Sequence, residues 1–452
     1  RRNGAAEADA AAAEEETEGF ATPVPKPEYR HTLMGGAQCE YVAAVDFDAC
    51  GRRLLVVQAD LIIVFDVATM LEVGRCVGHT ETINMAEFSR EREYHVARPS
   101  MRAKPRIVSA SEDKTAIVWC GVTFAQLAVL RHRGADAEVA KARWSPNSAM
   151  IATVRDDGVV TLWDSEIPDP PEDDTSSDAS DDASDEKSDG GGGEGAGKSA
   201  DAPRAAKYTQ LKTFSDWGGG FDDDYRAKDV SFDAKSRLLM VRTSAPRMQL
   251  LVFAHDPSWG TWSSVAVHGG ADLKVEAAAW NPTASSRSLE KGDLALVSSV
   301  SQSGRQKSYT LSLYGEHSLP GSETTTIVHV CSTPLRYCMG GGNNSVHSSL
   351  RWSGRRLISV DQKGVTLIAV ADNGAVTELA TLRMDRADIG TKDSDFYCAA
   401  WHGSYVATGS DEGHGLLWAL APANAGAAEA LLRGDPALGI GYVEPLSPTL
   451  FD

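Results

Sequence analysis

The sequence predicts an all-β protein built from seven repeated sheets, and three observations support this prediction. An apolar segment that ends in an aromatic residue and a turn recurs along the chain, each time followed by an alternating segment and a second apolar segment. In the two clearest copies an aspartate lies six residues before a tryptophan, as Asp113 before Trp119 and Asp157 before Trp163. No apolar run approaches the roughly 18–20 residues that a membrane-spanning helix needs, so we expect no membrane partner.

The repeats can be placed along the chain by their strand pattern. The first three are expected at 41–47, 54–58 and 61–66; at 83–88 and 107–119; and at 139–146 and 151–164, with 208–212 as the outer strand of the third. Alternate residues of a strand share one face, so Ser109 and Ser111 point the same way. Asp113 and Asp157 fall where tight turns are expected.

Four weaker repeats follow the third. They are expected at 230–232, 238–241, 249–253 and 262–267; at 275–282, 295–299, 309–314 and 324–330; at 346–352, 357–360, 365–370 and 376–382; and at 396–401, 405–410 and 416–418. The last copy has Glu412 where the turn aspartate would stand. The fourth repeat lacks the polar residues of the second and third.

The clearest repeats resemble those of the WD40-repeat family, which run from a Gly-His pair to a Trp-Asp pair. Here the residues that carry the resemblance are Gly78-His79 and Trp163-Asp164. The resemblance implies a seven-bladed WD40-type β-propeller in which each repeat forms a four-stranded blade. It covers roughly residues 29–420, and the acidic stretch described below would be a disordered insertion in the third blade.

The resemblance also implies buried hydrogen-bonded networks that hold the strands of a blade together. The candidate network residues are His79, Ser109, Ser111, Asp113, Trp119, Thr153, Asp157, Trp163, Thr408, Ser410 and Trp418. An aspartate, a histidine and a serine could instead form a hydrolase triad. We favour the structural interpretation, because Trp119 adds an indole donor and the spacing is that of the repeat.

A ring must also close, which requires a partner for the last outer strand. We expect residues 29–33 to pair with the last blade and cover its edge, with 430–433 as the competing candidate. The chain then divides into five segments. These are an acidic Ala- and Glu-rich, disordered segment at 1–28, the first part of the propeller at 29–164, an acidic low-complexity insertion at 165–207, the rest of the propeller at 208–420 and a C-terminal tail at 421–452.

The net charge of −19 is concentrated in two segments. Residues 165–203 carry thirteen acidic side chains and two lysines, and residues 1–20 carry six acidic side chains and two arginines. The remainder is nearly neutral, so the composition offers no basic surface for nucleic acid. The tract in 165–203 is too poor in apolar residues to fold alone. It is a solubilising loop, a docking segment for basic partners or a phosphorylation-controlled one; its candidate docking residues are Asp173, Asp174, Asp178, Asp181, Asp182, Asp185 and Glu186.

Several patterns that suggest chemistry fail a physical test. Residues 192–199 match the phosphate-loop pattern, yet they follow an acidic serine tract and precede Ala200 to Pro203, with neither the buried strand nor the helix that a phosphate loop needs. We therefore expect no nucleotide there. The eleven histidines are scattered, and the seven cysteines form no C-x2-C pair, so we expect no metal site and no other cofactor.

These observations favour a protein without catalytic residues, which acts as a scaffold for protein–protein interactions in a multiprotein complex. The alternative is a binder of basic, histone-like or ribosomal proteins that uses the acidic insertion in chromatin or ribosome assembly. An enzyme that gathers its residues in the central channel is a further possibility, because a fold alone does not define a function. The odd number of scattered cysteines predicts reduced thiols and an intracellular location, in the cytoplasm or the nucleus.

Overall fold

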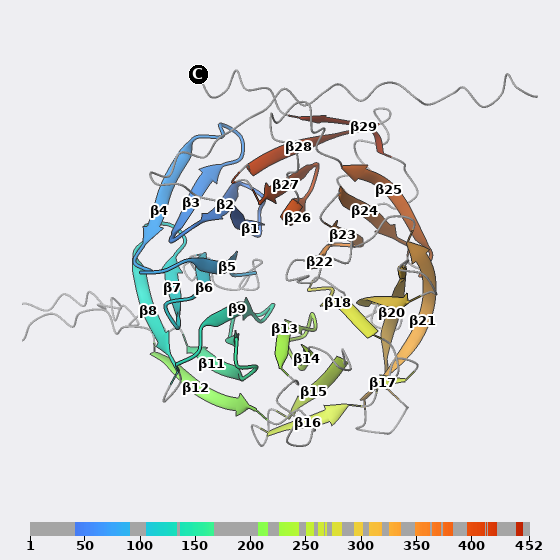
Figure 1. Cartoon of the computed structure of the whole chain (residues 1–452), viewed down its shortest axis with the longest axis horizontal. Coiled ribbons are helices and arrows are strands. Elements are labelled where there is room, and N and C mark those ends of the chain that lie inside the picture. The colour runs from blue at the N-terminus through green and yellow to red at the C-terminus, as the bar shows by residue number, and fades with distance from the viewer. Residues whose placement is uncertain are drawn as a thin grey trace, which may run out of the picture.

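The computed structural model describes residues 41–90, 105–132, 136–166, 207–215, 226–243 and, with further gaps, 250–445. The strands of these residues form seven sheets around a common axis, and the described part of the chain contains no helix (Figure 1). Neighbouring strands within each sheet are antiparallel, apart from one short added strand. The prediction of an all-β, seven-bladed propeller is thus confirmed.

The first three blades contain the strongest repeats. Their strands are β1 (Val42–Phe47), β2 (Arg53–Gln58), β3 (Leu61–Asp66) and β4 (Glu72–Val77); β5 (Ile83–Phe88), β6 (Arg106–Ser111), β7 (Thr115–Cys120) and β8 (Gln126–Arg131); and β9 (Val139–Trp144), β10 (Met150–Arg155), β11 (Val160–Glu166) and β12 (Lys207–Phe214). The inner three strands of these blades are largely buried, whereas β4 and β8 are largely exposed. This exposure explains why the sequence pattern did not reveal the outer strands β4 and β8.

The remaining four blades follow in chain order around the ring. Their strands are β13 (Ala227–Phe232), β14 (Leu238–Thr243), β15 (Leu250–Asp256) and β16 (Thr261–Val265); β18 (Lys274–Trp280), β19 (Leu294–Ser301), β20 (Lys307–Ser318) and β21 (Thr325–Leu335); β22 (Ser349–Ser353), β23 (Arg356–Asp361), β24 (Gly364–Val370) and β25 (Val376–Leu382); and β26 (Phe396–His402), β27 (Tyr405–Ser410), β28 (Gly415–Pro422) and β29 (Ile440–Pro445). A short strand, β17 (Val267–His268), adds to β21 in parallel.

The hydrophobic core is divided among the interfaces between blades. Seven clusters of buried side chains each join two neighbouring blades, and one of them joins the last blade to the first. Strand residues of both alternating faces are therefore apolar, because each blade is covered on both sides. No blade has a core of its own, so the ring is stabilised as a unit.

The ring closes through β26 and β27 of the seventh blade, which pack against β1. Gly409 lies at this junction, where a Cβ atom would stand 2.5 Å from the side chain of Val42 and 2.7 Å from Sγ of Cys398. The thiol of Cys398 donates a hydrogen bond to the carbonyl of Val42 over 3.5 Å. The first and last blades are thus held together by side-chain packing.

The outer strand of the seventh blade lies near the C-terminus of the chain. The strand beside β28 is β29, in which Val443 is the partner of Leu420, whereas the expected closing strand at 29–33 lies outside the described residues. The competing candidate at 430–433 also lies outside them. β29 follows 17 residues after β28 and contains Ile440, Tyr442 and Val443, an apolar pattern that the sequence reading assigned to a tail. Among the described residues, the C-terminal segment supplies the fourth strand of this sheet.

Candidate functional site

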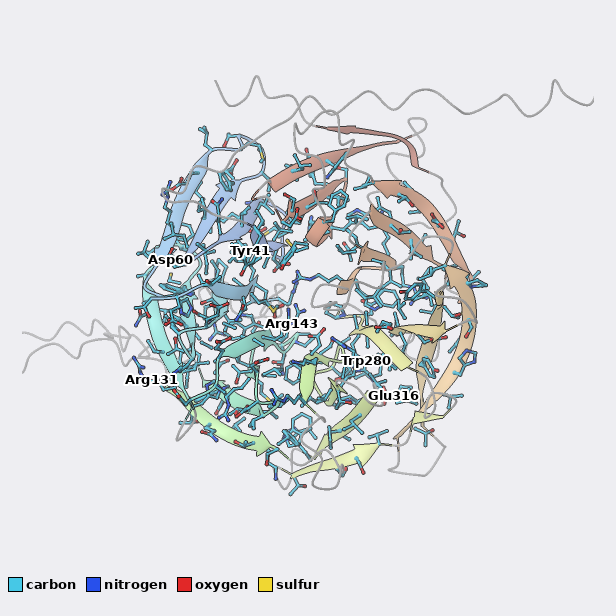
Figure 2. All side chains as sticks on the ribbon, viewed as in Figure 1. Tyr41, Asp60, Arg131, Arg143, Trp280 and Glu316 are labelled. Atoms are coloured by element: carbon cyan, nitrogen blue, oxygen red, sulfur yellow. The ribbon has the colours of Figure 1, made fainter. Side chains whose placement is uncertain are left out.

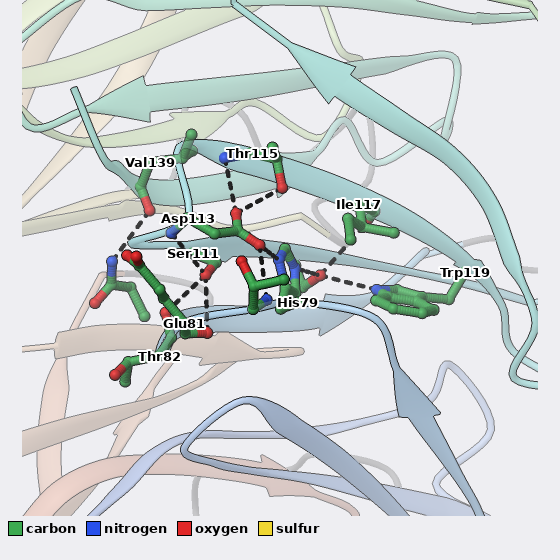
Figure 3. A network of polar contacts seen from close by, with 12 residues as sticks. His79, Glu81, Thr82, Ser111, Asp113, Thr115, Ile117, Trp119 and Val139 are labelled. Atoms are coloured by element: carbon green, nitrogen blue, oxygen red, sulfur yellow. Dashed lines mark hydrogen bonds and ion pairs between the residues drawn. The ribbon is translucent and has the colours of Figure 1, made fainter. Parts of the chain in front are cut away.

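The second blade brings four of the predicted network residues together. His79 contacts Asp113 through Nδ1 over 2.7 Å and Ser109 through Nε2 over 2.7 Å (Figure 3). The indole Nε1 of Trp119 donates to the same Ser109 hydroxyl over 2.8 Å. Ser111, the other candidate serine, instead donates to the carbonyl of Thr82 over 2.9 Å. Both serines are candidates from the sequence, and the structure places Ser109 between the histidine and the tryptophan.

The turn between β6 and β7 sets the position of Asp113. Its Oδ1 accepts hydrogen bonds from the backbone N–H and the hydroxyl of Thr115, over 2.9 and 2.6 Å. Lys114, between them, has a φ of 68°. The matching position of the third blade is Gly158, with a φ of 87°, and glycine tolerates this left-handed conformation without strain.

The chemistry of this network is that of a closed structural unit. Burial lowers the pKa of His79 despite the neighbouring carboxylate, so the imidazole is neutral at pH 7. Burial alone would raise the pKa of Asp113, but hydrogen bonds from Thr115 and His79 outweigh it, and the pKa is lowered. Ser109 is 0% exposed and its oxygen is bonded to both Trp119 and His79. A triad serine must reach its substrate, and this one does not.

The third blade has a related but different network. The indole of Trp163 donates to the hydroxyl of Thr153 over 2.9 Å, and Nε2 of His132 lies 2.8 Å from the same oxygen. Asp157 does not join them: it binds the guanidinium of Arg155 and accepts from the backbone N–H of Val159 over 3.2 Å. His132 was missed in the sequence because it is followed by Arg-Gly rather than preceded by glycine.

The seventh blade keeps the simplest form of the arrangement. Trp418 donates to the hydroxyl of Thr408 over 3.0 Å, and Ser410 is completely buried near the end of the same strand. In all three blades a tryptophan of the third strand therefore bonds a hydroxyl of the second strand, ten positions earlier. The shared bond joins adjacent strands of one blade.

The third-blade network should make the protein sensitive to mild acid. Burial, and after it the nearby Arg155, lower the pKa of His132 from 6.5 to about 4. Between pH 6.5 and pH 4, His132 is therefore protonated in the unfolded chain but neutral in the folded chain. Its contribution to the free energy of unfolding is complete above pH 6.5 and falls by roughly 2–3 kcal/mol as the pH approaches 4. In urea titrations, the free energy separating wild type from His132→Gln should shrink from pH 8 to pH 4.5. A separation that is independent of pH would contradict this role.

A second polar cluster lies at the inner ends of the blades, and the sequence reading did not detect it. Asp46 accepts hydrogen bonds from the backbone N–H of Phe88 over 2.9 Å and from Arg90 over 3.0 Å. Glu87 accepts from the backbone N–H of Trp144 over 2.6 Å and from Arg143 over 2.9 Å. Figure 2 shows Arg143 on the inner side of the ring. Each carboxylate precedes the aromatic residue that ends an inner strand, a repeated position that could have revealed the cluster.

The predicted acidic docking residues at 173–186 lie outside the described residues, but the strands on either side of the insertion are placed. β11 and β12 pair directly, with Glu166 opposite Lys207. The insertion therefore leaves and re-enters the outer part of one blade at neighbouring points. Tyr208, in the predicted outer strand, accepts a hydrogen bond from Arg106 of the second blade over 3.2 Å.

In the part of the chain that the structure describes, no group of three or more His, Cys, Asp and Glu side chains could hold a metal ion. Within the same part, no helix is long and apolar enough to cross a membrane.

Comparisons with known proteins agree with this architecture. A family profile described as "WD domain, G-beta repeat" matches residues 125–164, which span the outer strand of the second blade and three strands of the third. Among solved structures, the β-propeller domain of Cps50 (Swd1) from Myceliophteria thermophila is similar, with a TM-score of 0.52 and 14% sequence identity. The similarity covers 86% of this chain and 98% of that domain. The comparison with curated proteins found no match.

Proposed function

We propose that this seven-bladed β-propeller, which carries a WD40 repeat, is a non-catalytic scaffold that binds other proteins in a multiprotein complex. The observation that carries the proposal is the closed network of the second blade. Its His79, Ser109 and Asp113 resemble a triad in composition, yet the hydroxyl of Ser109 is buried and bonded to Trp119. The polar side chains that could suggest catalysis instead hold strands together. Partners would then bind to the loops and faces of the ring.

A substrate panel separates the scaffold from an enzyme. The purified full chain should show no turnover of ester, peptide, phosphate or nucleotide substrates, because no nucleophile of the network reaches solvent. Ser109→Ala serves as the matched variant, since it removes the candidate nucleophile. Turnover by wild type that Ser109→Ala abolishes would establish an enzyme and overturn the proposal.

A reducing intracellular location, the cytoplasm or the nucleus, is part of the proposal. None of the five cysteines in the described residues forms a disulfide: Cys50, Cys76, Cys120, Cys331 and Cys398. Burial raises the pKa of both Cys76 and Cys398 to about 12, which keeps these thiols protonated and unreactive. Cysteines that form no disulfide are typical of reducing compartments.

Basic proteins are the partner class that the acidic insertion favours. Residues 168–203 carry twelve acidic side chains and two lysines, and the strands on either side of them pair with Glu166 opposite Lys207. A concentrated negative charge attracts cationic segments and speeds their encounter. We propose that this segment adds affinity for a basic partner, histone-like or ribosomal in character.

Deletion of residues 168–203 should leave the propeller folded. Four residues would then connect β11 to β12 in place of forty, and the loop-closure cost falls by about 2 kcal/mol if the short connection is unstrained. Circular dichroism and thermal melting check the fold, and binding to a lysine-rich peptide at 50 and 300 mM salt checks the charge effect. The deletion should remove the salt-dependent binding that wild type shows. An unfolded deletion variant, or unchanged peptide binding, would contradict the assignment.

A further inference from the structure

The inner strands share one position whose side chain bonds the next blade. Asp46 and Glu87 occupy it in the first two blades, and each accepts the backbone N–H of the aromatic residue at the matching place of the following blade. Ser231 of the fourth blade does the same toward Trp280 over 3.1 Å. The position is thus an acceptor site that links neighbouring blades.

Two blades have an arginine at this position, and an arginine cannot accept a hydrogen bond. Arg143 of the third blade donates to Glu87 over 2.9 Å. Arg351 of the sixth blade donates to the carbonyl of Val45 and to Asp46, both over 3.3 Å. Arg143 and Arg351 also repel each other electrostatically, so guanidinium groups from the third and sixth blades lie close together on the inner side of the ring.

Positive charge exceeds negative charge around this point. The cations are Arg90, Lys141, Arg143, Arg242 and Arg351, and the acids that interact with them are Asp46, Glu87, Asp229 and Glu276. Among the described residues that these interactions connect, five cations face four acids, an excess of one positive charge. We call this set the axial cluster.

Two nitrogen atoms of the axial cluster lack a hydrogen-bond acceptor among the described residues. The ammonium group of Lys141 makes no hydrogen bond there, and Nε of Arg242 is buried without a partner. Burial, and the repulsion of Arg143, Arg351 and Arg242, lower the pKa of Lys141 to about 8 despite the attraction of Asp229. Two neighbouring side chains remain reachable by water, because Arg143 is 18% and Arg351 is 15% exposed. A small anionic group can therefore approach them.

We propose that the axial cluster binds one carboxylate, supplied by an Asp or Glu side chain that a protein partner inserts into the ring axis. The proposal rests on the proposed scaffold function and adds the chemistry of the partner's anchor. Arg143 and Arg351 carry planar guanidinium groups, each with several N–H donors of a geometry that matches a carboxylate, and Lys141 adds a point charge that interacts with both. A single negative charge balances the cluster, whereas a phosphate dianion would meet the nearby Asp46 and Glu87.

Acetate is the probe for the site itself. In the full chain with ¹³C-methylated lysines, the Lys141 resonance, identified by its absence in Lys141→Arg, should titrate near pH 8. Saturating acetate should raise that pKa by about one unit, because a bound anion favours the charged amine. Arg351→Lys should weaken the acetate response about tenfold, since a lysine lacks the planar donor pair. Lys212 on the exposed strand β12 is the internal control and should not respond.

Failure of carboxylate binding and failure of the scaffold function give different results. A Lys141 resonance that ignores acetate, or that responds to inorganic phosphate alone, would overturn the carboxylate assignment even if the chain still resides in a complex. In the complex itself, Lys141→Glu should release a partner that Lys212→Glu retains. If Lys141→Glu retained every partner, no partner would bind through the axial cluster. If the chain responded to acetate but had no protein partner, the carboxylate would not come from a protein.

Discussion

Trp119→Ala is expected to lower the free energy of unfolding by about 3–5 kcal/mol. The indole is 1% exposed and packs in the cluster that joins the first blade to the second. Its truncation leaves a cavity and deprives the hydroxyl of Ser109 of its donor. Typical domains have only 5–15 kcal/mol of net stability, so a loss of this size is readily measured by urea denaturation at constant pH.

Two further variants identify the cause of that loss. Trp119→Phe retains much of the packing but not the N–H donor, and it should cost less than the alanine variant. Val77→Ala, at a side chain that is 66% exposed on β4, should change the stability by no more than about 0.5 kcal/mol. Equal stability of Trp119→Ala and Val77→Ala would show that the indole does not hold the blade.

Glu87→Ala is expected to cost a similar amount, about 3–5 kcal/mol, for an electrostatic reason. The side chain is 3% exposed and accepts from the backbone N–H of Trp144 and from Arg143. Removing one partner of a buried ion pair leaves the other charge uncompensated. Glu87→Gln, which keeps an acceptor for Trp144, should lose less. Thermal melting and urea titration of the three proteins test this order, and equal losses would contradict it.

The sequence predicted the blades best where they are buried on both faces. Strand positions of the second and third blades followed from runs such as Ile107 to Ser111, which the structure places entirely in the interior. The outer strands β4 and β8 could not be found in this way, because most of their side chains face solvent and no burial pattern constrains them. β29 was missed for a different reason: residues 423–439, which separate it from β28, show no strand pattern that would predict the pairing.

In the candidate site, too, residues close together in the sequence could be predicted, whereas those brought together from different blades could not. Ser109, Asp113 and Trp119 lie on one hairpin, and their spacing was enough to select them. His132 and the axial cluster depend on which side chains the ring brings together from different blades. Arg351 and Asp46 are 305 residues apart in the chain, and only closure of the ring places them in contact.

The central claim is that the chain binds proteins and performs no reaction. Its most direct test is native mass spectrometry of the full chain, isolated under reducing conditions at its natural abundance. We predict a mass well above the 48.2 kDa of the chain, with a fixed stoichiometry of other proteins that persists without cross-linking. Recovery of the chain only at 48.2 kDa, at the concentration that the protein has in the cell, would contradict the claim.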